Sequence, residues 1–197
     1  MIEEILNAIV VNDLQPLSAI LTRVGGLVRV QRETGVNGGA EKRYPVVNKL
    51  PQDCEAGDYS DMSPNSKEVA ILYFQAISKP STVEVLSGVF REDWSLRVVC
   101  WFNSEKVDAT ASRLAANIAA RIKRRQPNIG NYLTCITTKF TGFDAKSADI
   151  FSAFTYNEAK SQYLMKPYDF FSFTIEVGYL FTPSCVPTTN LVSNDCA

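Results

Sequence analysis

The fold is decided by residues 67–103, which read KEVAILYFQAISKPSTVEVLSGVFREDWSLRVVCWFN. Val69–Ile77 is apolar at both alternating sets of positions, which is typical of a strand that is covered on both faces. The turn-forming Ser78–Ser81 and the charged Arg91–Asp93 divide the stretch into three strand-like parts. Because connections this short join antiparallel neighbours, the pattern predicts a three-stranded meander at the centre of a sheet.

Two strands are predicted to present one apolar face to a core. In the strand-like stretch 94–102, Ser95 and Arg97 lie on the face opposite the apolar positions. In the later stretch 171–179, apolar residues alternate strictly with residues that are polar or glycine. The apolar positions are Trp94, Leu96, Val98, Cys100 and Phe102 in the first strand, and Phe171, Phe173, Ile175, Val177 and Tyr179 in the second. The second of these strands is therefore expected to cover the sheet core on one side.

An amphipathic helix is predicted at the N-terminus, because apolar residues recur there at the spacing of one helical face. These residues are Ile2, Ile5, Leu6 and Ile9. Asn12-Asp13 and Pro16 are expected to end this helix. A short helical turn at Leu17–Arg23 is expected to follow, and the Gly25-Gly26 pair to break it.

A second helix is predicted in the alanine-rich run 109–125, for which Asp108 is a suitable N-cap. Pro127 and the residues after it are expected to end the helix. One face of the helix is apolar and is expected to pack on the sheet through Ala111, Leu114, Ala115, Ile118 and Ile122. Asp144 is expected to cap a third, shorter helix that carries Ile150, Phe151 and Phe154.

Further strands are predicted at Leu27–Glu33, at its hairpin partner Lys42–Val47 and at Tyr132–Thr141. Residues 48–66, with two prolines and many turn-forming residues, are expected to be a long loop. This loop is either a solvated insertion or an arm that orders against a neighbouring subunit. After Thr182 the chain has two more prolines and no periodicity, which predicts an extended tail.

These patterns together predict an α+β fold: a mostly antiparallel sheet packed by the alanine-rich helix and the N-terminal helix. We expect a single domain at residues 1–181, which includes the long loop at 48–66, and an extended C-terminal tail at 182–197. A chain of 197 residues is long enough to bury a substantial core.

The charge and the apolar pattern of the chain give no support to a nucleic-acid or membrane partner. The formal net charge of −1 gives no global attraction to nucleic acid or to a membrane surface. No apolar run reaches the roughly 18 residues that a membrane helix needs. The N-terminus is acidic where a secretion signal is basic. We therefore expect a protein that folds in a cytoplasm and has no membrane partner.

The sequence contains no histidine, so a Ser-His-Asp or Cys-His arrangement is impossible. It also contains neither a GxxxxGK[ST] phosphate loop nor a GxGxxG fingerprint, and none of its five cysteines has CxxC spacing. We therefore expect no enzyme, no cofactor, and no catalytic or metal-ligating residues. Catalysis by carboxylates, lysine, tyrosine or a loop cysteine such as Cys54 stays open.

The candidate for cation binding is the acidic cluster Asp53, Glu55, Asp58 and Asp61. Carboxylates are suitable ligands for hard cations, but the spacing does not match that of a calcium-binding loop. The alternative interpretation is a solvated acidic loop.

The strongest basic cluster is Arg121, Lys123, Arg124 and Arg125, at the end of the alanine-rich helix. Cations at this end of a helix complement its dipole, and this alone accounts for their position. The alternative interpretation is a contact with DNA in a channel or with an acidic partner. Most aromatic residues occupy predicted strand faces, so they do not offer the stacking positions of a nucleic-acid reader.

Residues 67–181 resemble the small neck and tail proteins of tailed bacteriophages. The resemblance lies in the order of the elements: the meander that ends LRVVCWFN, the alanine-rich helix and the closing strand DFFSFTIEVGYLF. Tail-terminator proteins and head–tail joining proteins, including the ring-forming neck proteins of crAss-like phages, have an α+β body of this kind. The long loop at 48–66 is a departure from the most compact of them.

The resemblance implies a structural virion subunit that is assembled in the host cytoplasm and forms a homo-oligomeric ring around the DNA channel. Its partners would be neighbouring neck, tail or portal proteins, and DNA would pass without sequence-specific binding. These proteins work through surfaces, so the resemblance assigns no functional residues. The alternatives are a component of a contractile injection-type assembly, a histidine-free enzyme and a nucleic-acid-binding module.

Overall fold

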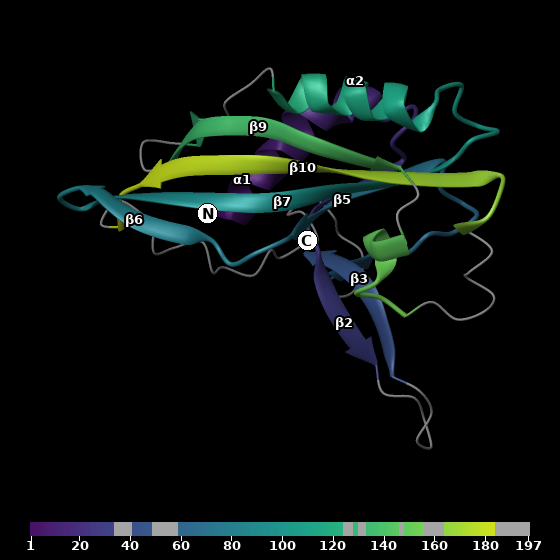
Figure 1. Cartoon of the computed structure of the whole chain (residues 1–197), viewed down its shortest axis with the longest axis horizontal. Helices are drawn as coiled ribbons and strands as arrows, with labels where there is room; N and C mark the ends of the chain where they lie inside the picture. Colours follow the sequence, from purple (N-terminus) through teal and green to yellow (C-terminus); the bar gives the residue numbers. More distant parts are fainter. Residues whose placement is uncertain are drawn as a thin grey trace, which may run out of the picture.

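The centre of the molecule is a seven-stranded sheet, and a second sheet of three strands lies below it in Figure 1. The structure is a computed structural model. It describes residues 1–33, 41–48, 59–123, 128–129, 133–145, 148–155 and 164–183. The α+β class and the mostly antiparallel sheet are confirmed, because every strand pair except β1–β5 is antiparallel.

The strands of the large sheet follow the order β1-β5-β7-β10-β9-β8, and β6 also pairs with β7. Their bounds are β1 Arg23–Leu27, β5 Ala70–Ala76, β6 Ser81–Leu86, β7 Val89–Asn103, β8 Asn128–Ile129, β9 Leu133–Ala145 and β10 Tyr168–Phe181. The small sheet has the order β2-β3-β4, with β2 Arg29–Glu33, β3 Lys42–Asn48 and β4 Tyr59–Asp61.

The predicted meander is wrong. β5 pairs with one half of β7 and β6 with the other half, so both lie on the same edge of this long strand and run in the same direction. The chain reverses at Ser87-Gly88, where Gly88 has a φ of 75° that glycine adopts without strain. Arg91 and Asp93 do not turn the chain: they pair side by side within β7.

One face of the large sheet packs against the helices α1 (Ile2–Ile9) and α2 (Ala111–Lys123). We call the buried apolar cluster between them the helix-side core, and Figure 1 shows α2 lying over β9 and β10. The predicted apolar faces of both helices and of β7 and β10 all belong to it. A π-helical turn, Val10–Leu14, and a 3-10 turn, Gln15–Leu17, continue α1 and add Leu14 to this core.

The described residues cover the opposite face of the sheet at one end. There Ile71, Tyr73, Val99 and Trp101 form a second core. Their partners come from β3, from the residues next to β2 and β4, and from the 3-10 turn η4 (Ala148–Phe151) and the residues after it. They are Val28 just before β2, Val47 in β3, Met62 just after β4, Ile150, Phe151 and Phe154. The aromatic rings of Trp101 and Tyr168 stack with their centroids 4.9 Å apart. This end of the sheet is therefore buried on both faces, and the end that carries β6 is not.

Gly25 and Gly26 do not break the chain, as was predicted, but lie within β1. A Cβ on Gly25 would lie 2.8 Å from Cγ1 of Val47, and a Cβ on Gly26 would lie 2.9 Å from Oδ1 of Asn7. The glycine pair is therefore explained by close packing of the small sheet and α1 on either side of β1.

Two predicted helix caps are also wrong. Thr110, not Asp108, caps α2, because its Oγ1 accepts a hydrogen bond from the Arg113 N–H at 3.3 Å. Asp144 lies in β9, opposite Ser172 of β10, and does not begin a helix. The residues of the predicted third helix are still buried, but they belong to the short turn η4 and the residues after it.

The predicted hairpin of Leu27–Glu33 with Lys42–Val47 is confirmed as β2 and β3, although Leu27 itself ends β1. The predicted strand Tyr132–Thr141 is confirmed from Leu133 and continues to Ala145. Of the predicted loop at 48–66, Asn48 ends β3, Tyr59–Asp61 forms β4, and residues 49–58 lie outside the described residues. Residues 184–197 of the predicted tail also lie outside them. No described helix has the length and apolar character required to cross a membrane.

Candidate assembly surface

The hairpin formed by β6 and the first half of β7 extends past the second core, at the left of Figure 1. All six residues of β6 are exposed. The inner edge of β6 pairs with β7, and no strand in the described part of the chain pairs with its outer edge. A strand edge of this kind leaves backbone N–H and C=O groups free to pair with another strand.

The exposed side chains of this hairpin include large aliphatic groups. Val83, Val85 and Leu86 are 58%, 45% and 70% exposed, and Ile77, just before β6, is 48% exposed. Val83 lies opposite Arg91 and Leu86 opposite Val89. Soluble proteins seldom expose several neighbouring aliphatic groups, and where they do the patch often marks a contact surface. We call residues 77–86 the β6 edge.

The base of the hairpin is polar on the face away from the helices. The Arg91 guanidinium donates hydrogen bonds to both carboxylate oxygens of Asp93, at distances from 2.8 to 3.1 Å. This hydrogen bonding raises the pKa of Arg91. Lys139 Nζ lies 3.8 Å from Glu176 Oε2. The two ion pairs, Arg91–Asp93 and Lys139–Glu176, line a shallow depression together with Lys79. Because each of the four paired side chains faces an opposite charge, none of these four is an isolated catalytic group.

On the helix side, the hairpin is fixed to β10 by one aromatic stack and one side-chain hydrogen bond. The rings of Phe90 and Phe181 stack with their centroids 5.7 Å apart. The buried Tyr179 hydroxyl donates a hydrogen bond to the Glu92 carboxylate. Burial, and then this hydrogen bond, raise the pKa of Tyr179 above its ordinary value of 10.0. The hairpin is thus joined firmly to the body, so that the β6 edge is held in a fixed position.

The raised pKa of Tyr179 gives a prediction for alkaline pH. Below pH 10 the phenol is neutral in both the folded and the unfolded chain, and its full contribution to stability is present. Above about pH 10 the unfolded chain loses this proton first, so the free energy of unfolding falls by up to about 1.4 kcal/mol per pH unit. Tyr179→Phe is expected to reduce this alkaline slope in urea titrations.

The matched control is Tyr59→Phe, because the Tyr59 side chain is 47% exposed. This variant is expected to keep the alkaline slope of the unmodified protein. Equal slopes in Tyr179→Phe and Tyr59→Phe would contradict the assignment.

β9 pairs with the edge of β10 that does not pair with β7, and it carries two half-exposed aromatic rings, Phe140 and Phe143. Gly142, with a φ of 68°, is an extra residue in β9: Thr141 pairs with Thr174 and Phe143 with Phe173. This bulge places Phe140 and Phe143 on the same face, where their rings contact those of Phe173 and Phe171 at 5.1 and 5.9 Å. The two rings therefore extend the helix-side core toward the edge of the sheet.

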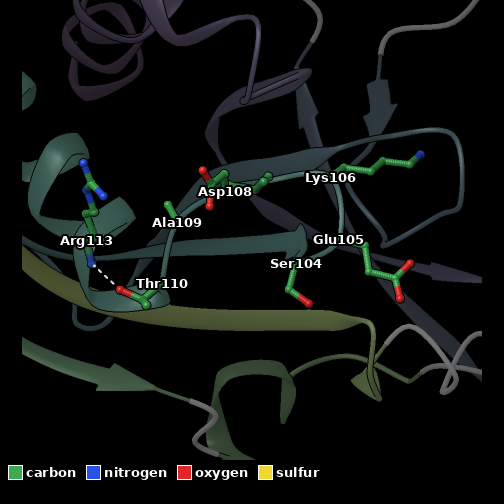
Figure 2. Close-up of a pocket in the computed structure, with 8 residues that line it drawn as sticks. Ser104, Glu105, Lys106, Asp108, Ala109, Thr110 and Arg113 are labelled. Carbon is green, nitrogen blue, oxygen red and sulfur yellow. Dashed lines mark hydrogen bonds between the residues drawn. The ribbon is translucent and has the colours of Figure 1, made fainter.

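A second depression lies in the loop that joins β7 to α2, between Ser104 and Arg113. Figure 2 shows Arg113 on the first turn of α2 and Lys106 at the far end of the loop, with their side chains pointing away from each other. The Glu105 carboxylate also points away from Arg113. Because these charged groups do not converge on one point, the depression does not define a site for a charged ligand.

The structure describes two of the four residues of the predicted basic cluster. Arg121 is a half-buried residue of α2, and Lys123 ends this helix. Arg124 and Arg125 lie outside the described residues. Contact of this cluster with DNA or with an acidic partner stays a prediction.

Of the acidic cluster, Asp61 lies in β4, and its Oδ1 accepts a hydrogen bond from the Ser63 N–H at 2.7 Å. Asp53, Glu55 and Asp58 lie outside the described residues. Within the described residues, no group of three or more carboxylates or thiols is placed to hold a metal ion. The Cys100 thiol is fully buried in the helix-side core, and burial raises its pKa, which keeps the thiol protonated.

The β6 edge did not emerge from the sequence as a functional surface. Its signal is the dipeptide Ser87-Gly88, a turn-forming pair that lies between two strand-like runs. Comparison with models of known protein families finds no match, and comparison with curated proteins finds none either.

Proposed function

We propose that this protein is a structural subunit that assembles with copies of itself, and that the β6 edge is the place where a neighbouring chain joins. The observation that carries the proposal is the exposed β6, with three exposed aliphatic side chains and an outer edge that no strand of the described residues pairs with. Pairing with an added strand would satisfy the free backbone groups and bury these side chains in one step.

The rest of the molecule supports this role. A hairpin held on one side only has limited stability of its own. Here β7 is fixed to β10 along its whole length, and the Phe90–Phe181 and Tyr179–Glu92 contacts lie beneath the hairpin. The fold thus presents a firmly held edge that no strand of the described residues covers, and such an edge is suited to assembly.

We further propose a place for this assembly: a ring in the neck or tail of a tailed phage, as a tail terminator or a head–tail joining protein. The resemblance of residues 67–181 to these proteins supports this setting. Neighbouring neck, tail or portal proteins would be its other partners, and DNA would pass through the ring without sequence-specific contacts. A contractile injection-type assembly would use the same edge and is the second setting that we consider.

The experiment is to measure the mass of the purified full-length protein by sedimentation velocity over a range of concentrations, and to image it by negative-stain electron microscopy. We expect oligomers of defined size that appear as closed rings. A protein that remains monomeric at every concentration, alone and with purified neck and tail components, would contradict the proposal. Enzymatic turnover that survives when the β6 edge is altered would favour the alternative of a histidine-free enzyme.

A further inference from the structure

We infer that the strand added to the β6 edge is the C-terminal segment of a neighbouring copy, residues 184–197. This inference rests on the proposed function and names the partner of the same surface. It follows from three features: the point at which the described chain leaves the body, the direction in which it leaves, and the composition of the segment.

The chain leaves the body beside the hairpin. β10 ends at Phe181, which lies opposite Phe90 of β7, and Phe90 in turn lies opposite Glu84 of β6. Thr182 and Pro183 follow, and Pro183 is exposed. In Figure 1 the arrowhead of β10 points to the same end of the sheet as the β6–β7 hairpin. The segment after Pro183 therefore begins at the end of the molecule where the open edge lies.

The direction of β10 favours pairing of the segment with β6 of a neighbouring copy over pairing with β6 of its own chain. β10 and β6 are both antiparallel to β7, so they run in the same direction, and the chain at Pro183 is moving away from the body. To reach its own β6, the segment would have to reverse at once and pass around both β7 and β6. Pro183 and Pro187 bias the residue before each of them toward an extended backbone, which suits a segment that continues outward. A neighbouring copy can be reached without a reversal.

The composition of residues 184–197, SCVPTTNLVSNDCA, matches that of an added strand. Thr188, Thr189 and Val192 are β-branched, and Leu191 adds an apolar side chain. The segment has no lysine, the charged residue that most often protects natural strand edges from pairing, and its one proline, Pro187, precedes the strand-like run 188–192. Its one charged side chain is Asp195, and β6 likewise has one, Glu84.

The length of the segment is sufficient. Fourteen residues span up to about 46–50 Å when extended. A strand that matches the six residues of β6 takes about 20 Å of this. The remainder is available to cross between two copies. Because each copy then donates one segment and accepts another at a different surface, the interface is head-to-tail, and it closes into a ring when the rotation between neighbouring copies is a whole fraction of a turn.

The test separates donor from acceptor. A chain that ends at Pro183 keeps the β6 edge but lacks the donor segment. The full-length variant Val83→Lys/Leu86→Lys keeps the donor segment but has a blocked edge. Each protein alone is expected to be monomeric in sedimentation velocity, under reducing conditions that exclude disulfides of Cys185 and Cys196. Mixed together, they are expected to form one-to-one dimers and nothing larger, because only one donor–acceptor pair is available.

A synthetic peptide of residues 184–197 gives the second measurement. It is expected to bind the truncated chain in fluorescence anisotropy. Binding is expected to be at least tenfold weaker when the peptide carries Leu191→Asp/Val192→Asp, or when the truncated chain carries Val83→Lys/Leu86→Lys.

Three outcomes would overturn the inference. If the truncated chain still forms the full oligomer while Val83→Lys/Leu86→Lys does not, the proposed function stands and the donor is another segment. If both proteins still form the full oligomer, the inference and the role of the β6 edge are both wrong. If the peptide binds the truncated chain but the unmodified protein is monomeric, the segment covers β6 of its own chain. The inference that a neighbouring copy donates the segment would then be wrong.

Discussion

Phe173→Ala is expected to lower the free energy of unfolding by about 3–5 kcal/mol, the cost of truncating a large aromatic side chain in a close-packed core. Phe173 is 2% exposed and lies near the middle of β10, between β7 and β9. Its ring contacts that of Phe140 at 5.1 Å and that of Phe171 at 6.4 Å. Because β10 is paired on both sides, its backbone cannot move to fill the space that the ring leaves. Urea unfolding gives the measurement.

Phe140→Ala is the matched control, because it removes the other ring of the same contact. The Phe140 side chain is 41% exposed, so its truncation leaves a notch open to solvent and is expected to cost only about 1 kcal/mol. Equal losses in the two variants would mean that the helix-side core does not extend to the middle of β10 as described.

Val83→Lys/Leu86→Lys is expected to weaken self-association by at least about 100-fold. Both side chains are exposed in the single chain, and both would be buried by an added strand. Losing that burial costs about 1.5 kcal/mol for each side chain, and each 1.4 kcal/mol is a factor of ten in affinity. The two lysines would also have to lose water beside the added strand. The dissociation constant from sedimentation is the measurement.

Val11→Lys/Val30→Lys is the matched control for this variant. It adds the same two charges at valines that are 41% and 42% exposed, one in the π-helical turn after α1 and the other in β2 of the small sheet. It is expected to leave self-association unchanged, and both variants are expected to unfold at nearly the same temperature as the unmodified protein. Equal loss of assembly in both variants would show that net charge, not the β6 edge, controls association.

The sequence was sufficient to predict the fold wherever burial follows a regular period. The apolar faces of α1, α2, β7 and β10 are the clearest cases, and all four meet in the helix-side core. Periodicity reports burial on one element at a time, however. It does not report which edge of a strand a neighbour takes, and this is why β5 and β6 were wrongly placed in a meander instead of end to end on one edge of β7.

Short signals were misinterpreted where packing gives a residue another purpose. Gly25-Gly26 has the composition of a chain break, yet its lack of side chains is required by Val47 and Asn7 on either side. Asp108 and Thr110 are both acceptable caps by residue type, and only the position of the first helical turn separates them. The exposure of β6 could not be predicted, because its alternating sequence is also that of a strand with one buried face.

The long ladder between β10 and β7 has a mechanical consequence. Each of the 14 residues of β10 lies opposite a residue of β7, and β9 pairs along the other side. Hydrogen bonds in antiparallel ladders are perpendicular to the strands, so tension applied beyond Phe181 along the strand loads them in shear, all at the same time. A tether at this end of the chain would transmit force to the centre of the sheet, where it is resisted by more ladder bonds than the five residue pairs that join β6 to β7.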